Sequence, residues 1–256
     1  MMIPLLCLKN ISYQISSKQA PILDNLSLDV YPGQCLVILG ANGSGKSSLI
    51  KAINGLIQPS KGTISFQGKD LLQIPLHRRS REIVTITQDL NFSTFSDLTV
   101  MENCLIALER GRPSTFFGLF SLSHKRQETF IAALLYRYNP KLYDKRHQTV
   151  SSLSGGERQL LAFALSLSND PLILLADEHT SATDPSIGQM LMQMTHTSAE
   201  ATNRATIITT HNLAYAQQYG HRLVLINRGK IVFDVTGREK QRLAHDELLA
   251  LYSSHR

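Results

Sequence analysis

The sequence has no apolar run of the roughly 18 residues that a membrane-spanning helix needs. Its opening, Met1 to Leu8, is apolar, but Pro4 interrupts it and it has neither a basic start nor a small-residue cleavage site. We therefore expect this segment to lead into a first strand and not to be a signal or lipoprotein peptide.

Cysteine is scarce. There are three cysteines, an odd number, at Cys7, Cys35 and Cys104. They are widely spaced, and none belongs to a C-x-x-C pattern. This usage argues against a disulfide framework or a zinc site and predicts reduced core residues in a cytosolic protein. The chain also lacks internal repeats and low-complexity tracts, and 43% of its residues are hydrophobic, which suits a folded core.

The charge balance is basic, with a net charge of +6. A basic surface can meet nucleic acid, acidic lipid headgroups or nucleotide. The densest basic cluster is His77 to Arg81, which we interpret as a solvated face. No aromatic platform surrounds it, as single-stranded nucleic-acid binding would favour.

The hydrophobic pattern predicts an α/β core with an inserted helical lobe. The middle of the chain is helical in texture, and between its helices residues 111–123 form a loop that carries Phe116, Phe117 and Phe120. Strands are expected at 6–15, 22–30, 35–39, 62–66, 83–87, 172–176, 205–209 and 222–226. Helices are expected at 46–53, 98–103, 125–137, 157–167 and 245–252.

A glycine-rich loop follows the apolar run Cys35 to Leu39 and opens a helix. It matches G-x-x-x-x-G-K-[ST], in which backbone N–H groups and a helix N-terminus bind phosphate. Lys46 is expected to reach the β- and γ-phosphates and Ser47 to bind Mg²⁺. The pattern alone indicates a nucleoside triphosphatase of any class. The candidate nucleotide-binding residues here are Gly40, Asn42, Gly43, Ser44, Gly45, Lys46, Ser47 and Ser48.

Two carboxylates, Asp177 and Glu178, end the apolar run that begins at Leu172. In α/β sheets, ligands bind beyond the C-terminal ends of strands. Asp177 is expected to hold the Mg²⁺ shell. Strand alternation points Glu178 the other way, where it would polarise the attacking water as a general base. The alternative without a catalytic role is a strand that ends in two solvated acidic residues.

The run Leu153 to Glu157 indicates which class of nucleoside triphosphatase this is. It resembles the Leu-Ser-Gly-Gly-Gln signature of the ATP-binding-cassette (ABC) ATPases, with Glu157 in place of the glutamine. Ser154 is expected to cap a helix, and Gly155 and Gly156 to bring backbone N–H groups to a phosphate. The resemblance implies that two subunits pair head to tail. The signature of one copy then covers the ATP that the other copy holds.

Other family elements occur in the same order. The resemblance implies that Tyr13 stacks on adenine, although alone it reads as a packing residue. It implies that Gln88 touches Mg²⁺ and water and couples to the membrane partner, and that His211 contacts the γ-phosphate. Asp184 closes a loop that normally reads Ser-Ala-Leu-Asp, and Thr183 departs from that pattern.

The predicted fold is a phosphate-loop (RecA-like) α/β core with an N-terminal antiparallel β region and an inserted α-helical lobe. We expect residues 1–88 and 161–240 to form the two parts of the ATP-binding core, 89–160 the helical signature lobe, and 241–256 a C-terminal helical tail.

The resemblance implies an ATPase with ATP and Mg²⁺ as cofactors that powers import of a small solute through separate permease subunits. Details such as His179 after the carboxylates resemble cassettes of bacterial importers with branched-chain-amino-acid-type permeases, which suggests an amino acid as cargo. The implied partners are a second copy, the permease and, indirectly, a periplasmic or lipid-anchored binding protein. No nucleic acid is expected. The implied localisation is the cytoplasmic face of the bacterial inner membrane, to which the protein would be peripherally bound.

Three alternatives stay open at this point: an ABC exporter subunit, a soluble ABC ATPase acting on nucleic acid, and a non-hydrolysing scaffold. The intact Lys46, Asp177, Glu178 and His211 argue against the last of these. The basic charge motivates the second, and DNA- or RNA-stimulated ATPase activity that weakens with salt would support it.

Overall fold

The computed structural model describes residues 3–16, 20–87, 89, 93–109, 124–181 and 183–254. The chain forms two compact units, which we call the first unit (residues 1–75, 172–178 and 192–256) and the second unit (residues 76–171 and 179–191). Among the helices described, none is long and apolar enough to cross a membrane. Gln88 and the predicted loop with Phe116, Phe117 and Phe120 lie outside the described residues.

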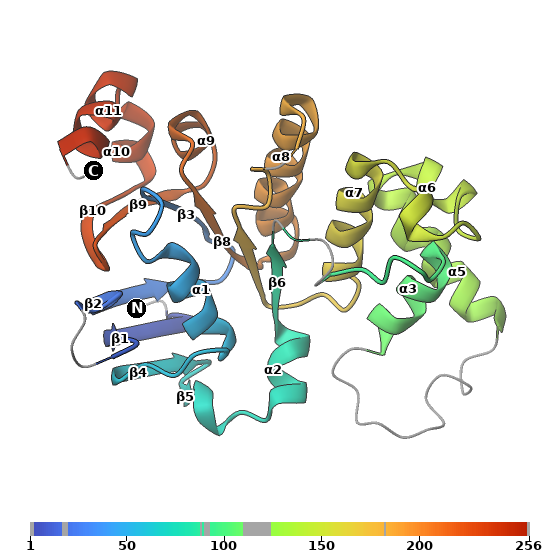
Figure 1. Ribbon diagram of the computed structural model, residues 1–256, viewed down its shortest axis with the longest axis horizontal. Helices are drawn as coiled ribbons and strands as arrows, with labels where there is room; N and C mark the ends of the chain where they lie inside the picture. Colours follow the sequence, from blue (N-terminus) through green and yellow to red (C-terminus); the bar gives the residue numbers. More distant parts are fainter. Residues whose placement is uncertain are drawn as a thin grey trace. The chain divides into compact units, whose positions relative to one another are not determined.

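An antiparallel sheet forms the N-terminal part of the first unit (Figure 1). Its strands are ordered β2-β1-β4-β5 and run over Leu23–Val30, Leu6–Tyr13, Lys61–Phe66 and Lys69–Asp70. One side of β1 is buried through Leu6, Leu8 and Ile11. One face of this sheet therefore packs on the core, as alternating apolar residues dictate.

A second sheet of the first unit is built from sequentially distant strands. They lie in the order β10-β9-β3-β8-β7 and cover Lys230–Thr236, Arg222–Asn227, Cys35–Leu39, Ala205–Thr210 and Ile173–Asp177. β3 pairs in parallel with β8 and β9, and β7 pairs in parallel with β8. Every residue of β3 and β8 is buried, and β3 is a continuous apolar run, as expected for a strand covered on both faces.

Short helices complete the first unit (Figure 1). α1 spans Lys46–Asn54, α9 spans Leu213–Gln218, α10 spans Gly237–Arg242 and α11 spans His245–Ser254. Apolar residues of α9 and α11 join those of the parallel strands in one buried cluster that includes Tyr219 and Leu248. The predicted C-terminal helix is therefore confirmed, and it packs on the sheet.

The second unit is mainly helical. It contains α2 (Leu76–Glu82), β6 (Ile83–Thr87), α3 (Val100–Leu108), α5 (His124–Tyr138), α6 (Pro140–Asp144) and α7 (Gly155–Ser166). α7 contacts both α3 and α5, and the rings of Tyr138 and Phe163 meet edge to face with centroids 5.4 Å apart. An α/β core with a helical lobe is therefore present and the fold class is confirmed, whereas the bounds 89–160 for that lobe stay a prediction.

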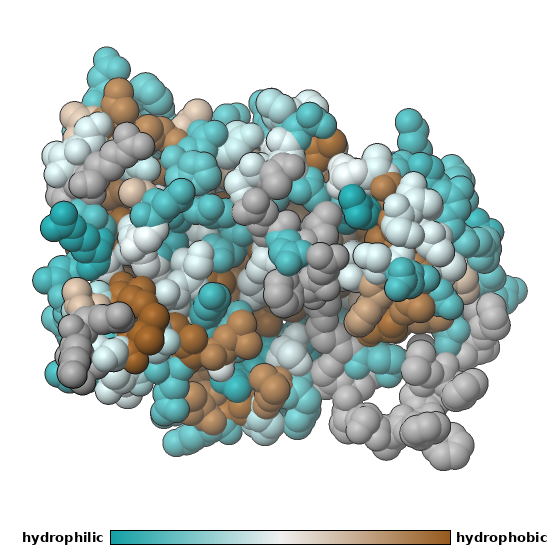
Figure 2. All heavy atoms as spheres, in the orientation of Figure 1, coloured by the Kyte–Doolittle hydropathy of each residue, from teal (hydrophilic) through white to brown (hydrophobic). Residues whose placement is uncertain are grey.

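Among the α-helices and strands described, those without a predicted range are β5, α2, α6, α8 (Pro185–Thr202), α9, β10 and α10. The basic cluster lies on α2, where His77, Arg78 and Arg81 are exposed, as a solvated face requires. Cys35 and Cys104 are buried free cysteines, whereas Cys7 is half-buried. Figure 2 shows apolar side chains that reach the surface on the face in view. In the first unit, the exposed large apolar residues include Ile15, Leu56 and Leu72.

Candidate active site

The glycine-rich loop joins the end of β3 to the start of α1. Lys46 is the first residue of α1, and its side chain is 4% exposed. The Lys46 Nζ donates to the carbonyl oxygens of Gly40 and Ala41 at 2.8 and 3.1 Å, and it lies 3.1 Å from the Glu178 Oε1. A buried ammonium is therefore held among acceptors at the mouth of the loop, as a phosphate-binding lysine needs.

Glycine is required at position 45 by both conformation and space. The Gly45 φ is +108°, in the region that L side chains rarely adopt. A Cβ there would lie 2.8 Å from the carbonyl oxygen of Ile22. The backbone of the loop therefore passes directly against the segment before β2. The Ser44 carbonyl accepts the Gly229 N–H at 2.9 Å, which braces the loop from the turn between β9 and β10.

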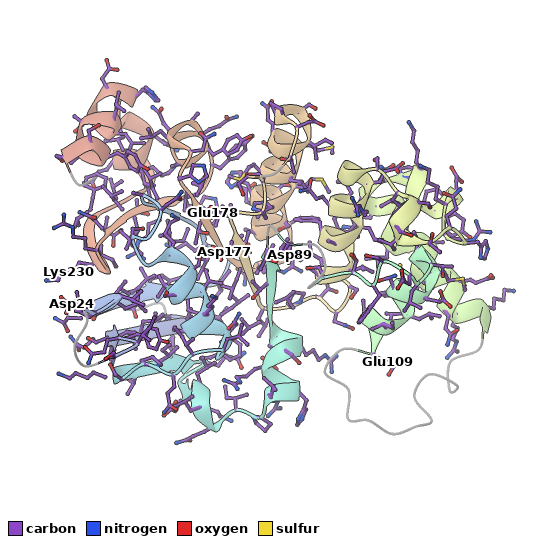
Figure 3. The ribbon with its side chains drawn as sticks, in the orientation of Figure 1. Asp24, Asp89, Glu109, Asp177, Glu178 and Lys230 are labelled. Carbon is purple, nitrogen blue, oxygen red and sulfur yellow. The ribbon has the colours of Figure 1, made fainter. Side chains whose placement is uncertain are left out.

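The two predicted carboxylates lie side by side at the end of β7 (Figure 3). The Asp177 Oδ1 accepts hydrogen bonds from Ser47 Oγ at 3.3 Å and from Thr209 Oγ1 at 2.6 Å. The Glu178 Oε2 lies 3.5 Å from the His211 Nδ1. The contact between Ser47 and Asp177 joins residues that are 130 positions apart in the sequence.

The prediction that Glu178 points away from Asp177 is wrong. Asp177 contacts the phosphate loop through Ser47, and Glu178 contacts it through Lys46. The reason is the Glu178 φ of +47°, which is left-handed and interrupts the strand alternation after Asp177. Both carboxylates thus serve the same site, where the phosphate loop supplies the positive charge.

An open cavity of about 390 Å³ lies over the loop. Its lining residues are Ile22, Asn42, Gly43, Gly45, Lys46, Ser47, Ser48 and Glu178. All but Ile22 were candidates from the sequence. Gly40 and Ser44 lie in the same loop, and both are buried. The chain therefore presents one continuous surface of backbone, hydroxyl and ammonium groups to this hollow.

Tyr13 is close to that cavity through its backbone. Its carbonyl oxygen accepts the Ile22 N–H at 2.7 Å, while its side chain is half-buried and does not line the hollow. Three contributors were missed by the sequence reading, namely Ile22, Thr209 and Gly229. No local pattern marks them, because each acts through a contact with a distant segment.

The signature residues lie in the second unit. Ser154 is the N-cap of α7, where its hydroxyl accepts the Glu157 N–H at 3.3 Å and the Glu157 carboxylate accepts the Ser154 N–H at 3.0 Å. This reciprocal pair is a capping box. A Cβ on Gly155 would meet open space, whereas one on Gly156 would meet Ile187. The exposed Ser154 and Gly155 leave the first turn of α7 accessible.

Glu157 carries an additional partner. The Lys145 Nζ lies 2.7 and 2.9 Å from its two carboxylate oxygens. The pKa of Glu157 is lowered, first by the hydrogen bond from Lys145 and also by the Ser154 backbone. The acidic variant of the signature is therefore charge-compensated within the same unit.

Asp184, the last residue of the loop with the Thr183 departure, is exposed. Its carbonyl oxygen accepts the Gly188 N–H at 2.8 Å, in the first turn of α8. The Thr183 hydroxyl donates to the Thr180 carbonyl at 2.8 Å, so the departing side chain is used to close the loop on itself.

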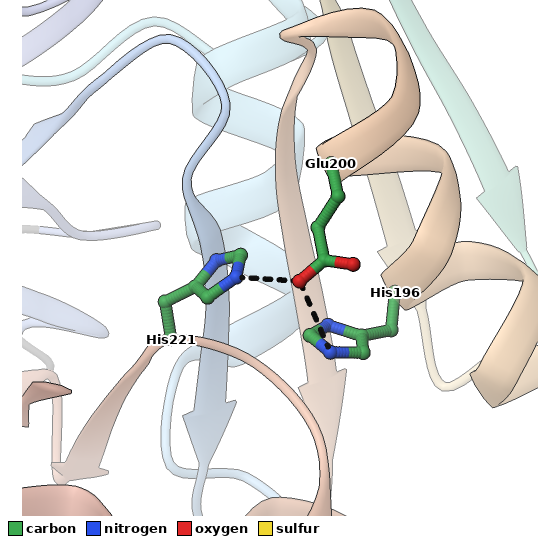
Figure 4. A group of neighbouring side chains, drawn as sticks. All are labelled: His196, Glu200 and His221. Carbon is green, nitrogen blue, oxygen red and sulfur yellow. Dashed lines mark hydrogen bonds and ion pairs between the residues drawn. The ribbon is translucent and has the colours of Figure 1, made fainter.

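A second cluster of titratable groups lies in the first unit, where His196, Glu200 and His221 have ligand atoms within 4.8 Å of one another (Figure 4). The His221 Nδ1 accepts the Cys35 N–H at 3.0 Å, so the neutral ring carries its proton on Nε2, which faces Glu200 at 3.3 Å. A metal-ligating histidine needs the opposite arrangement, with its other nitrogen donating. The geometry thus describes a hydrogen-bonded anchor for β3 and not a metal centre.

A glycine-rich loop between a buried parallel strand and a helix, faced by acidic residues at the end of β7 in the same sheet, is characteristic of phosphate-loop nucleotide-binding proteins. The chain belongs to the ABC transporter family, whose model matches residues 23–181. The resemblance drawn from the sequence is thereby confirmed.

Known relatives agree with this assignment. A tyrosine transport ATP-binding protein of Clostridioides difficile (strain R20291) is 35% identical over 228 residues, which is 89% of each chain. The methionine import ATP-binding protein MetN of Histophilus somni (strain 129Pt) is 33% identical over 231 residues, or 88% of this chain. The chain spans only 63% of that relative's length.

Among solved structures, cbiO1 from Clostridium perfringens, part of the ABC transporter complex cbiONQ, superposes with a TM-score of 0.80. The match covers 97% of this chain and 94% of that chain at 22% identity. At 22% identity, this similarity supports the fold alone.

Proposed function

We propose that this chain hydrolyses ATP as one half of a nucleotide sandwich dimer that powers import of a small solute, an amino acid, through a separate permease. The observation that carries the proposal is the convergence of Lys46, Asp177 and Glu178 on the phosphate loop. The relatives named for tyrosine transport and methionine import support the amino-acid class.

Binding of the triphosphate rests on the loop and Lys46. Backbone N–H groups of residues 40 to 48 and the N-terminus of α1 offer donors and partial positive charge to phosphate oxygens. Lys46 keeps its ammonium in a largely buried place, where attraction to an anionic phosphate exceeds its value in bulk water. The carbonyl oxygens of Gly40 and Ala41 hold the Lys46 side chain where it can bind a phosphate oxygen in their place.

The donor set at Ser47 and Asp177 fits Mg²⁺. Both offer hard oxygen atoms, and the Ser47 Oγ and Asp177 Oδ1 are 3.3 Å apart. Mg²⁺, when bound there, neutralises charge that develops on the β- and γ-phosphate oxygens. Gln88 is proposed as a further contact of the ion and of the attacking water.

Hydrolysis needs a base beside the γ-phosphate. Glu178 is in contact with both Lys46 and His211, so its carboxylate is oriented from two sides. We propose that Glu178 accepts a proton from the attacking water while His211 contacts the γ-phosphate. Lys46 then stabilises the negative charge of the transition state.

The second copy completes each site. The first turn of α7, with the exposed Ser154 and Gly155 and the half-buried Gly156, is proposed to cover the γ-phosphate held by the partner copy. Tyr13 is proposed to stack on adenine, and Asp184 to lie along the dimer contact. Two identical composite sites result from this isologous pairing.

The permease is a separate partner in this proposal. The dimer docks on it at the cytoplasmic face of a bacterial inner membrane, and a periplasmic or lipid-anchored binding protein delivers the solute from the other side. The division into residues 1–88, 89–160, 161–240 and 241–256 remains a prediction of the domain boundaries. Gln88 is proposed to pass the motion of dimer closure to the permease.

The test is Glu178→Gln. The variant should bind ATP with near wild-type affinity but hydrolyse it at least about 100-fold more slowly, since a positioned base contributes this much. With Mg-ATP it should shift from monomer to dimer in sedimentation, and Ser154→Arg should abolish the shift. Near-normal hydrolysis by Glu178→Gln would remove Glu178 from the base role. A nucleotide-bound monomer that never pairs would argue against the sandwich.

A further inference from the structure

We infer that Thr209 is the positioning residue that holds the two carboxylates of this site in register for ATP hydrolysis, an inference that rests on the proposed function. The sequence marked Thr209 only as a strand residue before His211. The structure places its hydroxyl between the Asp177 side chain and the Glu178 backbone.

The contact with Asp177 is short and directional. The Thr209 Oγ1 donates its only proton to the Asp177 Oδ1 at 2.6 Å, a length typical of a hydroxyl bound to a carboxylate. Thr209 and Asp177 are register partners of the parallel strands β8 and β7. Thr209 is 1% exposed, so water does not compete for the bond. The donor is therefore held by the sheet itself.

The same carboxylate oxygen also accepts the Ser47 hydroxyl. Ser47 stands at the start of α1, which follows β3, and Thr209 stands on β8, which lies between β3 and β7 in the strand order. With both donors on Oδ1, rotation of the Asp177 carboxylate is restricted. The orientation of the proposed Mg²⁺ shell then depends on Thr209 as well as on the phosphate loop.

Glu178 is held by the same side chain. Its N–H approaches both the Thr209 Oγ1 at 3.1 Å and the Thr209 carbonyl oxygen at 3.2 Å. This bond forms at the residue whose left-handed φ sends its carboxylate toward Lys46. A left-handed conformation in a glutamate persists only where the surroundings stabilise it. The Thr209 hydroxyl is one such stabilising contact.

The chain supplies a matched control in Thr206. It lies three positions earlier on the same strand, is fully buried, and its hydroxyl has no hydrogen-bond partner among the residues described. Thr206→Val and Thr209→Val make the same chemical change at comparable burial. Only Thr209→Val removes the hydrogen bonds to the Asp177 carboxylate and the Glu178 N–H.

The experiment compares wild type, Thr209→Val, Thr209→Ser and Thr206→Val in the full chain. The readouts are kcat, the Mg²⁺ concentration for half-maximal ATPase activity, ATP affinity without Mg²⁺, and the thermal unfolding midpoint. We expect Thr209→Val to lower kcat about 10- to 100-fold, because small misplacements of catalytic groups have effects of this size. Its Mg²⁺ requirement should rise, while ATP affinity without Mg²⁺ stays within about twofold.

Thr209→Ser keeps the hydroxyl and should restore kcat to within about threefold of wild type. Thr206→Val should match wild type in every readout. The inference is overturned if Thr209→Val keeps wild-type kcat and Mg²⁺ dependence, or if Thr206→Val and Thr209→Val lose activity equally. If Thr209→Val does not fold, Thr209→Ala against Thr209→Ser provides the same comparison. Failure of the proposed function would give a different result. The wild type would then show no ATPase activity, or an ATPase activity that Glu178→Gln does not abolish.

Discussion

The ion pair between Lys145 and Glu157 leads to a prediction about dimer formation. The ABC signature ordinarily ends in a neutral glutamine, and here a carboxylate stands in the first turn of the helix proposed to face the partner's γ-phosphate. Lys145 touches both oxygens of that carboxylate. Replacing Lys145 with alanine leaves an uncompensated negative charge beside an anion-binding helix end.

The magnitude follows from the geometry. The Lys145 and Glu157 side chains are 34% and 17% exposed, so solvent screens the pair partly. The loss of the lysine that compensates one partly screened carboxylate is expected to cost about 0.5–1 kcal/mol per site. Two identical sites in the dimer give about 1–2 kcal/mol, which corresponds to a dimer dissociation constant raised roughly 5- to 30-fold.

The assay is sedimentation equilibrium with Mg-ATP in a Glu178→Gln background, which keeps the nucleotide intact. Glu157→Gln added to Lys145→Ala should restore pairing, because glutamine retains the capping box and removes the charge. Lys141→Ala, which removes a nearby exposed lysine, is the matched control. The reasoning is refuted if Lys145→Ala pairs as tightly as its parent, or if Glu157→Gln fails to restore pairing. The loss should also shrink at 1 M salt, where charges are screened within about 3 Å.

Two predictions concern stability. Burial lowers the pKa of His179 from 6.5 to about 4. The unfolded chain thus takes up a proton near pH 6.5 that the folded chain resists, and stability falls as the pH drops from 6.5 to 4, by about 2 kcal/mol at pH 5. Urea unfolding at pH 7 and 5 should show this loss for wild type but not for His179→Asn, and equal losses in both would contradict it. Gly45→Ala should lower the free energy of unfolding by about 1–3 kcal/mol, because its Cβ meets the Ile22 carbonyl in a left-handed backbone. Gly155→Ala, which meets open space, should not, and equal destabilisation of the two would exclude the steric reason.

Local sequence patterns were sufficient to predict the features that depend only on residues close together in the sequence. The phosphate loop is recognisable because each of its residue types is required within one turn of chain, from the left-handed Gly45 to the buried Lys46 that opens α1. The strands of the parallel sheet are recognisable because burial on both faces demands continuous apolar runs. Ser154 as a helix cap is recognisable because its capping-box partner is three residues away.

The tertiary structure decided the features that join distant segments. The Thr209 hydroxyl reaches Asp177 across 32 positions, and Lys145 reaches Glu157 across 12, so no spacing rule marks either pair. The direction of Glu178 followed from one left-handed backbone angle and not from strand alternation. The sequence by itself thus determined the family and the fold class, and it supplied the residues of the proposed site. Only the folded chain decided how those groups are held, because hydrogen bonds between neighbouring strands depend on a pairing register that the sequence pattern does not contain.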